Sequence, residues 1–199
     1  MTRRRILEIV VALAVLGLLL AVFLVRTTAR HTAPPAAVLF RAVPGAPPDF
    51  AATGEAFLAA ESPDRARTAV LHPTEFEERA DLYVLTGPGE GVHYQLVDSL
   101  AGTWTPKAVG WLDASRLWVT LGWLYGTVSP GGDLYAVDPS DGSARLLWAT
   151  PDSGRTQAVG AAPARPGRGI VVRLKAFDAN LLAARDSTVV LPLERTPER

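Results

Sequence analysis

Hydrophobic and polar positions follow two different patterns in this chain of 199 residues, and the change of pattern predicts two parts. Residues 6–25 form an apolar run with one charge, Glu8, and three arginines directly precede it: Arg3, Arg4 and Arg5. In a helix with a rise of about 1.5 Å per residue, this run spans roughly 30 Å, the thickness of the hydrocarbon core of a bilayer. We therefore predict one transmembrane helix at 6–25, preceded by a basic cytoplasmic tip at 1–5.

The length of this run favours an uncleaved anchor over a secretory signal peptide. The apolar part of a cleaved signal is about 7–15 residues long and ends in a small-x-small site. Here the run is longer, and Val25-Arg26-Thr27 follows it without such a site. Thr2-Arg3-Arg4-Arg5-Ile6-Leu7 also resembles a twin-arginine export signal, which remains an alternative. The basic tip predicts a single-pass protein of a bacterial inner membrane, with its N-terminus cytoplasmic and its C-terminal domain periplasmic.

One face of the predicted helix is a candidate surface for another membrane helix. Val10, Ala14, Gly17 and Ala21 recur at spacings of three and four residues, which places them in one stripe. Small residues in such a stripe let a second helix approach closely, although Ala and Gly are also frequent enough here for chance. Glu8 lies near the cytoplasmic end, within reach of the headgroups or of a basic residue on a partner.

The segment after the span predicts a spacer and a short helix. Residues 26–52 are proline-rich, which favours extended and semi-rigid chain. Leu39 and Phe40 interrupt this linker, and we expect them on the membrane surface or on a neighbouring protein. Residues 53–80 read as a short helix, at 53–60 with Thr53 as its cap, followed by a connector.

From residue 81 to 194 the pattern changes to period two, with β-branched and aromatic residues between turn residues, which predicts strands. The pattern also repeats itself after about 50 residues. Three short segments carry the repeat: Asp81-Leu82-Tyr83 recurs as Asp133-Leu134-Tyr135, Ala108-Val109-Gly110 as Ala158-Val159-Gly160, and Leu117–Leu121 as Ile170–Leu174. A third start follows at Asp186, and residues 195–199 form a tail.

Each repeat predicts four short strands. In the second repeat they lie at 134–138, 144–149, 156–161 and 169–175, with a hairpin turn at 139–142. The stretch 132–142, Gly-Asp-Leu-Tyr-Ala-Val-Asp-Pro-Ser-Asp-Gly, resembles blades of β-propellers of the quinoprotein and TolB-like kinds. Residues 110–119, Gly-Trp-Leu-Asp-Ala-Ser-Arg-Leu-Trp-Val, look like the third and fourth strands of such a blade.

The number of repeats departs from that resemblance. A closed propeller needs at least about four blades, and this chain has room for two and a fragment. We therefore expect an all-β domain of two four-stranded antiparallel units, starting near residues 81 and 133, packed as a sandwich. An open, propeller-like array of sheets is the alternative.

Five aromatic residues are candidates for contact with a partner: Trp104, Trp111, Trp118, Trp123 and Tyr125. Exposed side chains of these types bind glycans, membrane interfaces or proteins. Packing in the core is the alternative, and we expect about half of the five there and one or two exposed.

Charge and motifs exclude several function classes. Residues 31–199 hold 15 basic and 19 acidic residues, a net charge of about −4, so no nucleic-acid partner is expected. The chain has no cysteine, hence no disulfide and no acylation site of a lipoprotein. Its three histidines, His31, His72 and His93, lack metal-ligand spacing. We find no nucleophile elbow, phosphate loop or haem motif, and expect no enzyme, cofactor or metal.

Two functions fit this architecture. The first is a non-catalytic accessory subunit of a larger membrane complex, photosynthetic or respiratory, with a β domain on its extracytoplasmic face and other subunits and lipid as partners. An assembly factor is not distinguishable from it by sequence. The second is a membrane-tethered periplasmic module that binds or senses a glycan or peptide.

Overall fold

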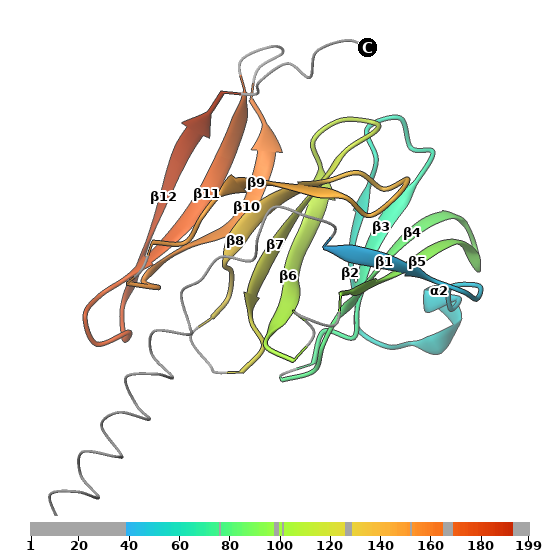
Figure 1. Cartoon of the computed structure of the whole chain (residues 1–199), viewed down its shortest axis with the longest axis horizontal. Helices are drawn as coiled ribbons and strands as arrows, with labels where there is room; N and C mark the ends of the chain where they lie inside the picture. The colour runs from blue at the N-terminus through green and yellow to red at the C-terminus, as the bar shows by residue number, and fades with distance from the viewer. Residues whose placement is uncertain are drawn as a thin grey trace, which may run out of the picture. The chain divides into compact units, whose positions relative to one another are not determined.

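Antiparallel strands make up almost all of the described part of the chain (Figure 1). A computed structural model describes residues 39–75, 77–97, 100, 102–125, 129–151, 153–164 and 169–192. They all belong to one compact unit, residues 33–199. Among them no helix is long and apolar enough to cross a bilayer. The predicted span at 6–25, with Glu8, Val10, Ala14, Gly17 and Ala21, lies outside the described residues.

The described strands form three antiparallel sheets. The first has the order β1-β5-β4-β3-β2, the second β6-β7-β8-β9 and the third β10-β11-β12. The strands are β1 (Phe40–Val43), β2 (Leu58–Glu61), β3 (Thr68–His72), β4 (Asp81–Gly87), β5 (Glu90–Leu96), β6 (Trp104–Trp111), β7 (Leu117–Trp123), β8 (Asp133–Val137), β9 (Ala144–Trp148), β10 (Thr156–Pro163), β11 (Ile170–Phe177) and β12 (Ala184–Leu191), with a single helical turn, α2 (Phe50–Thr53).

The second sheet is covered on both faces. On one face Leu117, Val119 and Tyr135 pack in a cluster with residues of the first sheet. On the other face Trp118 and Leu134 pack with residues of the third sheet. Because both faces are buried, all five residues of β8 and the first six of β7 are buried, where a strand with one wet face would alternate.

The prediction of a sandwich of two four-stranded sheets is therefore wrong, because the described strands form three sheets of five, four and three strands. The four strands expected in the second repeat exist, but β8 and β9 complete the sheet begun by β6 and β7, whereas β10 and β11 begin the next one with β12. A repeat fixes the order of strands but not the point at which one sheet ends. Strand β6 contacts β2, β3 and β4 on one side and β10 on the other, so the three sheets follow one another.

The pairing registers test the repeat residue by residue. Leu121 lies opposite Asp133, the first residue of β8, and His72 lies opposite Asp81, the first residue of β4, so the two aspartates hold the same place in their strands. In the third sheet the equivalent pair is Leu174 and Ser187, so the start expected at Asp186 is wrong by one residue.

The Ala-Val-Gly match is also out of register. Gly110 lies opposite Trp118, and the structurally equivalent pair of the third sheet is Ala162 opposite Val171, not a pair that contains Gly160. Gly160 thus lies in the equivalent strand, two residues from the equivalent position.

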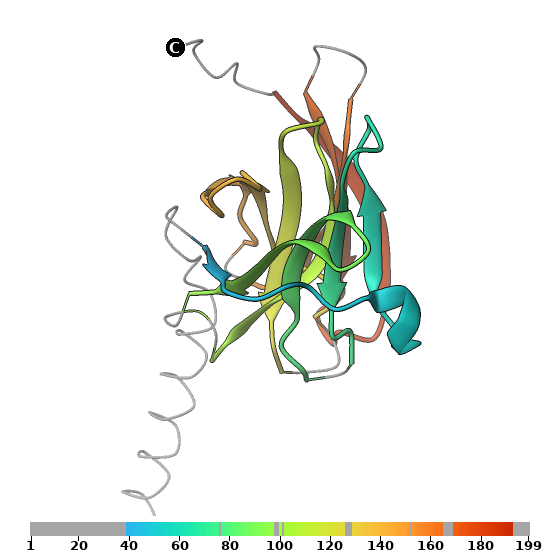
Figure 2. The ribbon, with the colours of Figure 1, turned by 90° about the vertical axis from the view of Figure 1, so that its right-hand side faces the viewer.

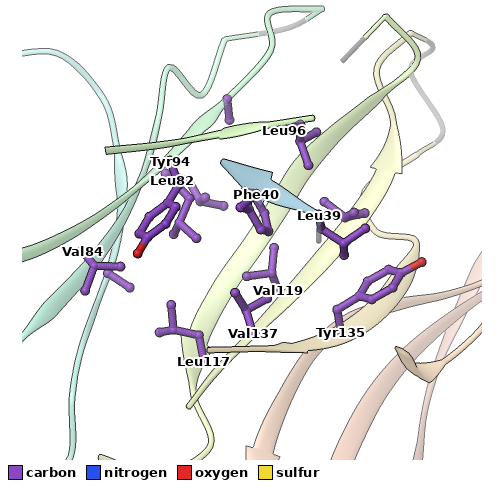
Figure 3. Packing of buried hydrophobic residues seen from close by; sticks show 14 of the residues in the cluster. Leu39, Phe40, Leu82, Val84, Tyr94, Leu96, Leu117, Val119, Tyr135 and Val137 are labelled. Atoms are coloured by element: carbon purple, nitrogen blue, oxygen red, sulfur yellow. The ribbon is translucent and has the colours of Figure 1, made fainter. Parts of the chain in front are cut away.

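The linker prediction is wrong at its C-terminal end. Leu39 and Phe40 are buried between the first and second sheets (Figure 3). Strand β1 pairs with the edge of β5, and the Phe40 N–H donates to the carbonyl of Gly142 in the turn before β9 (Figure 2). An extended, proline-flanked segment lacks internal hydrogen bonds, so an open sheet edge can take it up as a strand.

The short helix and the connector were also predicted incorrectly. Of the residues predicted to be helical at 53–60, only Thr53 lies in a helical turn, and residues 58–61 and 68–72 form β2 and β3. The β domain therefore begins at Phe40 rather than at residue 81. Ladder hydrogen bonds to β3 outweigh the local helix preference of Ala-Phe-Leu-Ala-Ala, because propensity is a weak term for a segment this short.

We predict that Gly110→Ala destabilises the fold by about 1–3 kcal/mol, the range for overpacking a core. A Cβ at residue 110 would lie 2.6 Å from the indole ring of Trp118, which is itself buried against the third sheet and has no room to move. The measurement is thermal or urea unfolding of the full chain, followed by tryptophan fluorescence.

Gly102→Ala is the matched control, because nothing lies within 4 Å of a Cβ at that position. Equal stability of the two variants would mean that Trp118 does not lie over Gly110.

Candidate functional site

The outer face of the first sheet, the face that points away from the second sheet, carries an unusual set of side chains. Leu71, Leu82 and Tyr94 pack toward the second sheet. The alternate positions of β3, β4 and β5 therefore form the outer face. They are Thr68, Val70, His72, Asp81, Tyr83, Leu85, His93 and Gln95.

The equivalent face of the second sheet, which points toward the first sheet, is buried. The registers match three cross-strand pairs of the first sheet to three of the second. His72–Asp81 matches Leu121–Asp133, Val70–Tyr83 matches Val119–Tyr135, and Tyr83–His93 matches Tyr135–Leu146. Histidines thus stand where two leucines pack in the second sheet, so this end of the stack has a different chemistry.

His93 is held by a carboxylate and an aromatic ring. Its Nε2 lies 2.8 Å from Oδ2 of Asp81, which also accepts a 2.9 Å hydrogen bond from Nε2 of Gln95. The imidazole stacks on Tyr83 with 4.5 Å between ring centroids and 12° between planes. Oδ1 of Asp81 is buried and has no hydrogen-bond partner among the described residues. These contacts fix the imidazole and leave one carboxylate oxygen unused.

His72 is held in a similar way on the neighbouring strand. Its Nε2 lies 3.0 Å from Oε2 of Glu55, and its Nδ1 lies 3.3 Å from the carbonyl of Ala56. Phe50 packs edge-on against His72 at 5.3 Å and against Tyr83 at 5.0 Å. The chain around α2 thus covers the middle of the outer face and orients this second histidine.

A cleft of about 360 Å³ opens on the other side of Phe50. Val70 and Leu85 form its apolar floor, and Phe50 and Phe57 form an aromatic wall. Its lining is completed by Pro48, Asp49, Arg65, Ala66, Arg67, Thr68, Thr86, Gly87, Pro88 and Gly89. This volume lies within the range of pockets for small ligands.

The two arginines of the cleft differ in freedom. Arg67 donates from Nη2 to the carbonyl of Ala114, and its guanidinium lies 4.9 Å from the centroid of the Trp111 ring, so its position is set by the fold. Arg65 has 83% of its side chain exposed and lies 4.0 Å from Glu61. The cleft therefore combines apolar walls with one positive charge fixed by the fold and one that is exposed.

The predicted aromatic candidates do not form one surface. Trp111 and Trp118 are buried on opposite faces of the second sheet. Trp104 and Trp123 lie opposite each other in the β6–β7 ladder and pack edge-to-face at 6.2 Å. Tyr125 is 51% exposed. Two of the five are therefore core residues, and Trp104 and Trp123 form a separate, partly buried pair.

Sequence reasoning missed the residues that the fold brings together. From the sequence, His72 and His93 lack metal-ligand spacing, and Asp81 marks only the start of a repeat. Only strand pairing places the three on one face. The one local signal was a histidine at a period-two position in each of two predicted β segments. No group of three or more His, Asp or Glu with metal-site geometry occurs in the described part of the chain.

Comparison with known proteins finds one family model and one solved structure that are similar to this chain. The family model described as "Domain of unknown function (DUF4652)" matches residues 89–190, just over half of the chain. The crystal structure of a candidate conserved lipoprotein from Clostridium novyi NT is similar, with a TM-score of 0.63 and 23% identity over 78% of this chain and 96% of that one. At this identity the likeness shows the fold, an all-β domain of antiparallel sheets. Comparison with curated proteins finds no match.

Asp133 shows what happens to the equivalent of Asp81 inside the stack. It is 1% exposed, its Oδ1 accepts a 2.6 Å hydrogen bond from the Thr150 N–H, and its Oδ2 is buried without a partner among the described residues. Burial raises the pKa of this carboxyl above its ordinary value. The folded state therefore holds this proton more tightly than the unfolded state does.

We predict that the wild type loses stability relative to Asp133→Asn as pH rises through the raised pKa. Below the ordinary carboxyl pKa of about 3.9, residue 133 is uncharged in the wild type and in Asp133→Asn, in the folded and in the unfolded state. The contribution of Asp133 to stability is then fully favourable. The measurement is the free energy of unfolding of both proteins between acidic and neutral pH.

Asp141→Asn supplies a control of opposite sign. Hydrogen bonds from Ser143 lower the pKa of Asp141, so its contribution is lost as pH falls. Parallel pH profiles for the wild type and Asp133→Asn would contradict the raised pKa.

Proposed function

This chain belongs to the family described as Domain of unknown function (DUF4652), and from that premise we propose that it is a membrane-anchored, extracytoplasmic binding module. Its site is the cleft on the outer face of the first sheet. The ligand is an apolar group with an anionic end, such as a hydrophobic residue at the C-terminus of a peptide.

The observation that carries this proposal is the contrast between equivalent faces of two sheets. In the second sheet this face is filled by a neighbouring sheet. In the first sheet it holds two oriented histidines and an aromatic-walled cleft with two arginines. Apolar walls with a few convergent polar groups are typical of ligand sites, and guanidinium groups bind carboxylates with good geometry.

The predicted N-terminal span supports placement at a membrane. That a protein of the same fold is named a candidate lipoprotein adds to this support, because lipid attachment is another way to hold a domain at a bilayer. This chain has no cysteine, so its own anchor in the proposal is the apolar segment at 6–25.

The accessory subunit remains the second candidate. The small-residue stripe at Val10, Ala14, Gly17 and Ala21 favours it, because such stripes are typical of helix pairs in membranes. A binding module and an accessory subunit differ in whether the protein has a constant partner.

We predict that N-acetyl-phenylalanine, added as its carboxylate, binds the full chain more tightly than N-acetyl-phenylalaninamide does. Arg65→Gln should weaken binding of the carboxylate by roughly three- to tenfold, since it removes one charge-assisted contact, and should leave the affinity for the amide unchanged. Calorimetry or ligand-observed NMR measures both affinities.

Arg173→Gln is the matched control, because Arg173 is an exposed arginine of the third sheet. Equal binding of acid and amide, or binding of neither, would remove the cleft as the site.

For the second candidate, gentle extraction from native membranes followed by sizing and mass spectrometry should show the chain at fixed stoichiometry with a large complex. Gly17→Leu should release it, because the larger side chain prevents close helix contact. Migration alone near its own mass of 21.2 kDa plus a micelle would reject the accessory subunit.

A further inference from the structure

The hairpin tip between β11 and β12, residues 178–183, carries two exposed leucines. Leu182 is 87% exposed, the highest fraction among the large hydrophobic side chains described, and its neighbour Leu181 is 43% exposed. The tip lies at the end of the third sheet (Figure 1). One exposed leucine is ordinary on a protein surface, but two adjacent ones at a turn are a costly choice of residue in water.

The backbone of this tip makes the choice more unusual. Leu181 has a φ of +60°, a conformation that disfavours side chains with a Cβ and that Gly or Asn would adopt at lower cost. A turn selected only for hairpin geometry would not place leucine there. The leucine side chain itself is therefore the feature to be explained.

Several backbone N–H groups of the tip are bonded within the tip itself. Oδ1 of Asp178 accepts from the N–H of Asn180 at 3.1 Å and of Leu182 at 3.0 Å. The Leu181 N–H donates to the carbonyl of Asp178 at 3.2 Å, and the Asp178 N–H donates to the carbonyl of Ala183 at 2.9 Å. These internal bonds lower the cost of moving the turn into an environment with little water.

Positive charge flanks the tip. Arg185 is exposed at the start of β12, and the carbonyl of the exposed Arg155 accepts from the Phe177 N–H, which places Arg155 at the base of the hairpin. Lys175 lies opposite Asp186 in the ladder, so these two charges offset each other. Against the exposed carboxylate of Asp178 in the tip, the two arginines leave one net positive charge, which favours a surface of anionic lipid headgroups.

We propose that this tip inserts Leu181 and Leu182 into the headgroup region of the bilayer and so forms a second membrane attachment. The inference rests on the anchoring part of the proposed function. The 14 residues between the predicted span and β1, 26–39, reach at most about 50 Å when fully extended, which keeps the domain near the same bilayer. Tethering turns a weak contact into an intramolecular one at an effective concentration of roughly millimolar, so two leucines suffice.

The absence of cysteine allows a site-specific test with the full chain. Asn180→Cys, labelled with an environment-sensitive fluorophore, leaves both leucines in place. The labelled protein is reconstituted in vesicles of phosphatidylcholine and phosphatidylglycerol whose acyl chains carry bromine as quencher. We expect a blue-shifted emission and quenching at residue 180.

Ser140→Cys, in the exposed turn between β8 and β9, is the matched control and should stay unquenched. Leu181→Ser with Leu182→Ser in the Asn180→Cys background should abolish the quenching. Arg185→Gln should weaken it in these vesicles but not in vesicles of phosphatidylcholine alone.

Two failures are distinguishable. If the chain floats with the vesicles but residue 180 is quenched no more than residue 140, the tip does not insert and the inference is overturned. If the chain does not float with the vesicles at all, the anchoring part of the proposed function fails together with it. Thermal unfolding of each labelled variant identifies any that is misfolded, and Leu182→Ser alone then replaces the double variant.

Discussion

Burial of both faces of the second sheet is the constraint on which the rest of this structure depends. Its strands β7 and β8 are apolar at nearly every position, so neither face tolerates water. One face needs the first sheet and the other needs the third. Because burying apolar surface is the main favourable term in folding, removal of either outer sheet would expose a whole cluster at once.

Strand β1 secures one side of this arrangement. It extends the first sheet at the edge of β5, and its first residue bonds to the turn between β8 and β9. The Tyr94 hydroxyl donates to the Pro139 carbonyl of the same turn at 2.9 Å. Two hydrogen bonds and a buried phenylalanine therefore join the sheets where the linker enters the domain.

The two ends of the stack are where the repeat departs from itself. A terminal unit of a stacked array has one face without a neighbour, and substitution of that face makes it soluble. The first sheet goes further than solubility requires, because its outer face holds two oriented histidines, an aromatic cover and a cleft. The third sheet ends in a hairpin whose tip exposes two adjacent leucines. The side chains of the middle sheet are thus used for packing, whereas the outer sheets can contact other molecules.

The sequence by itself determined the chemistry of local segments: an all-β domain, the strands of the second repeat, the turn at residues 139–142, and the equivalence of Asp81 and Asp133. Each of these depends on alternation and turn residues within about ten positions. Tertiary structure decided the rest. Whether β9 or β10 ends a sheet depends on which edge finds a partner, and Leu39 and Phe40 are core only because β5 offers an edge to them. His72, Asp81 and His93 lie on one face only through the pairing of β3, β4 and β5, since hydrogen-bond register and not any local preference brings these strands together.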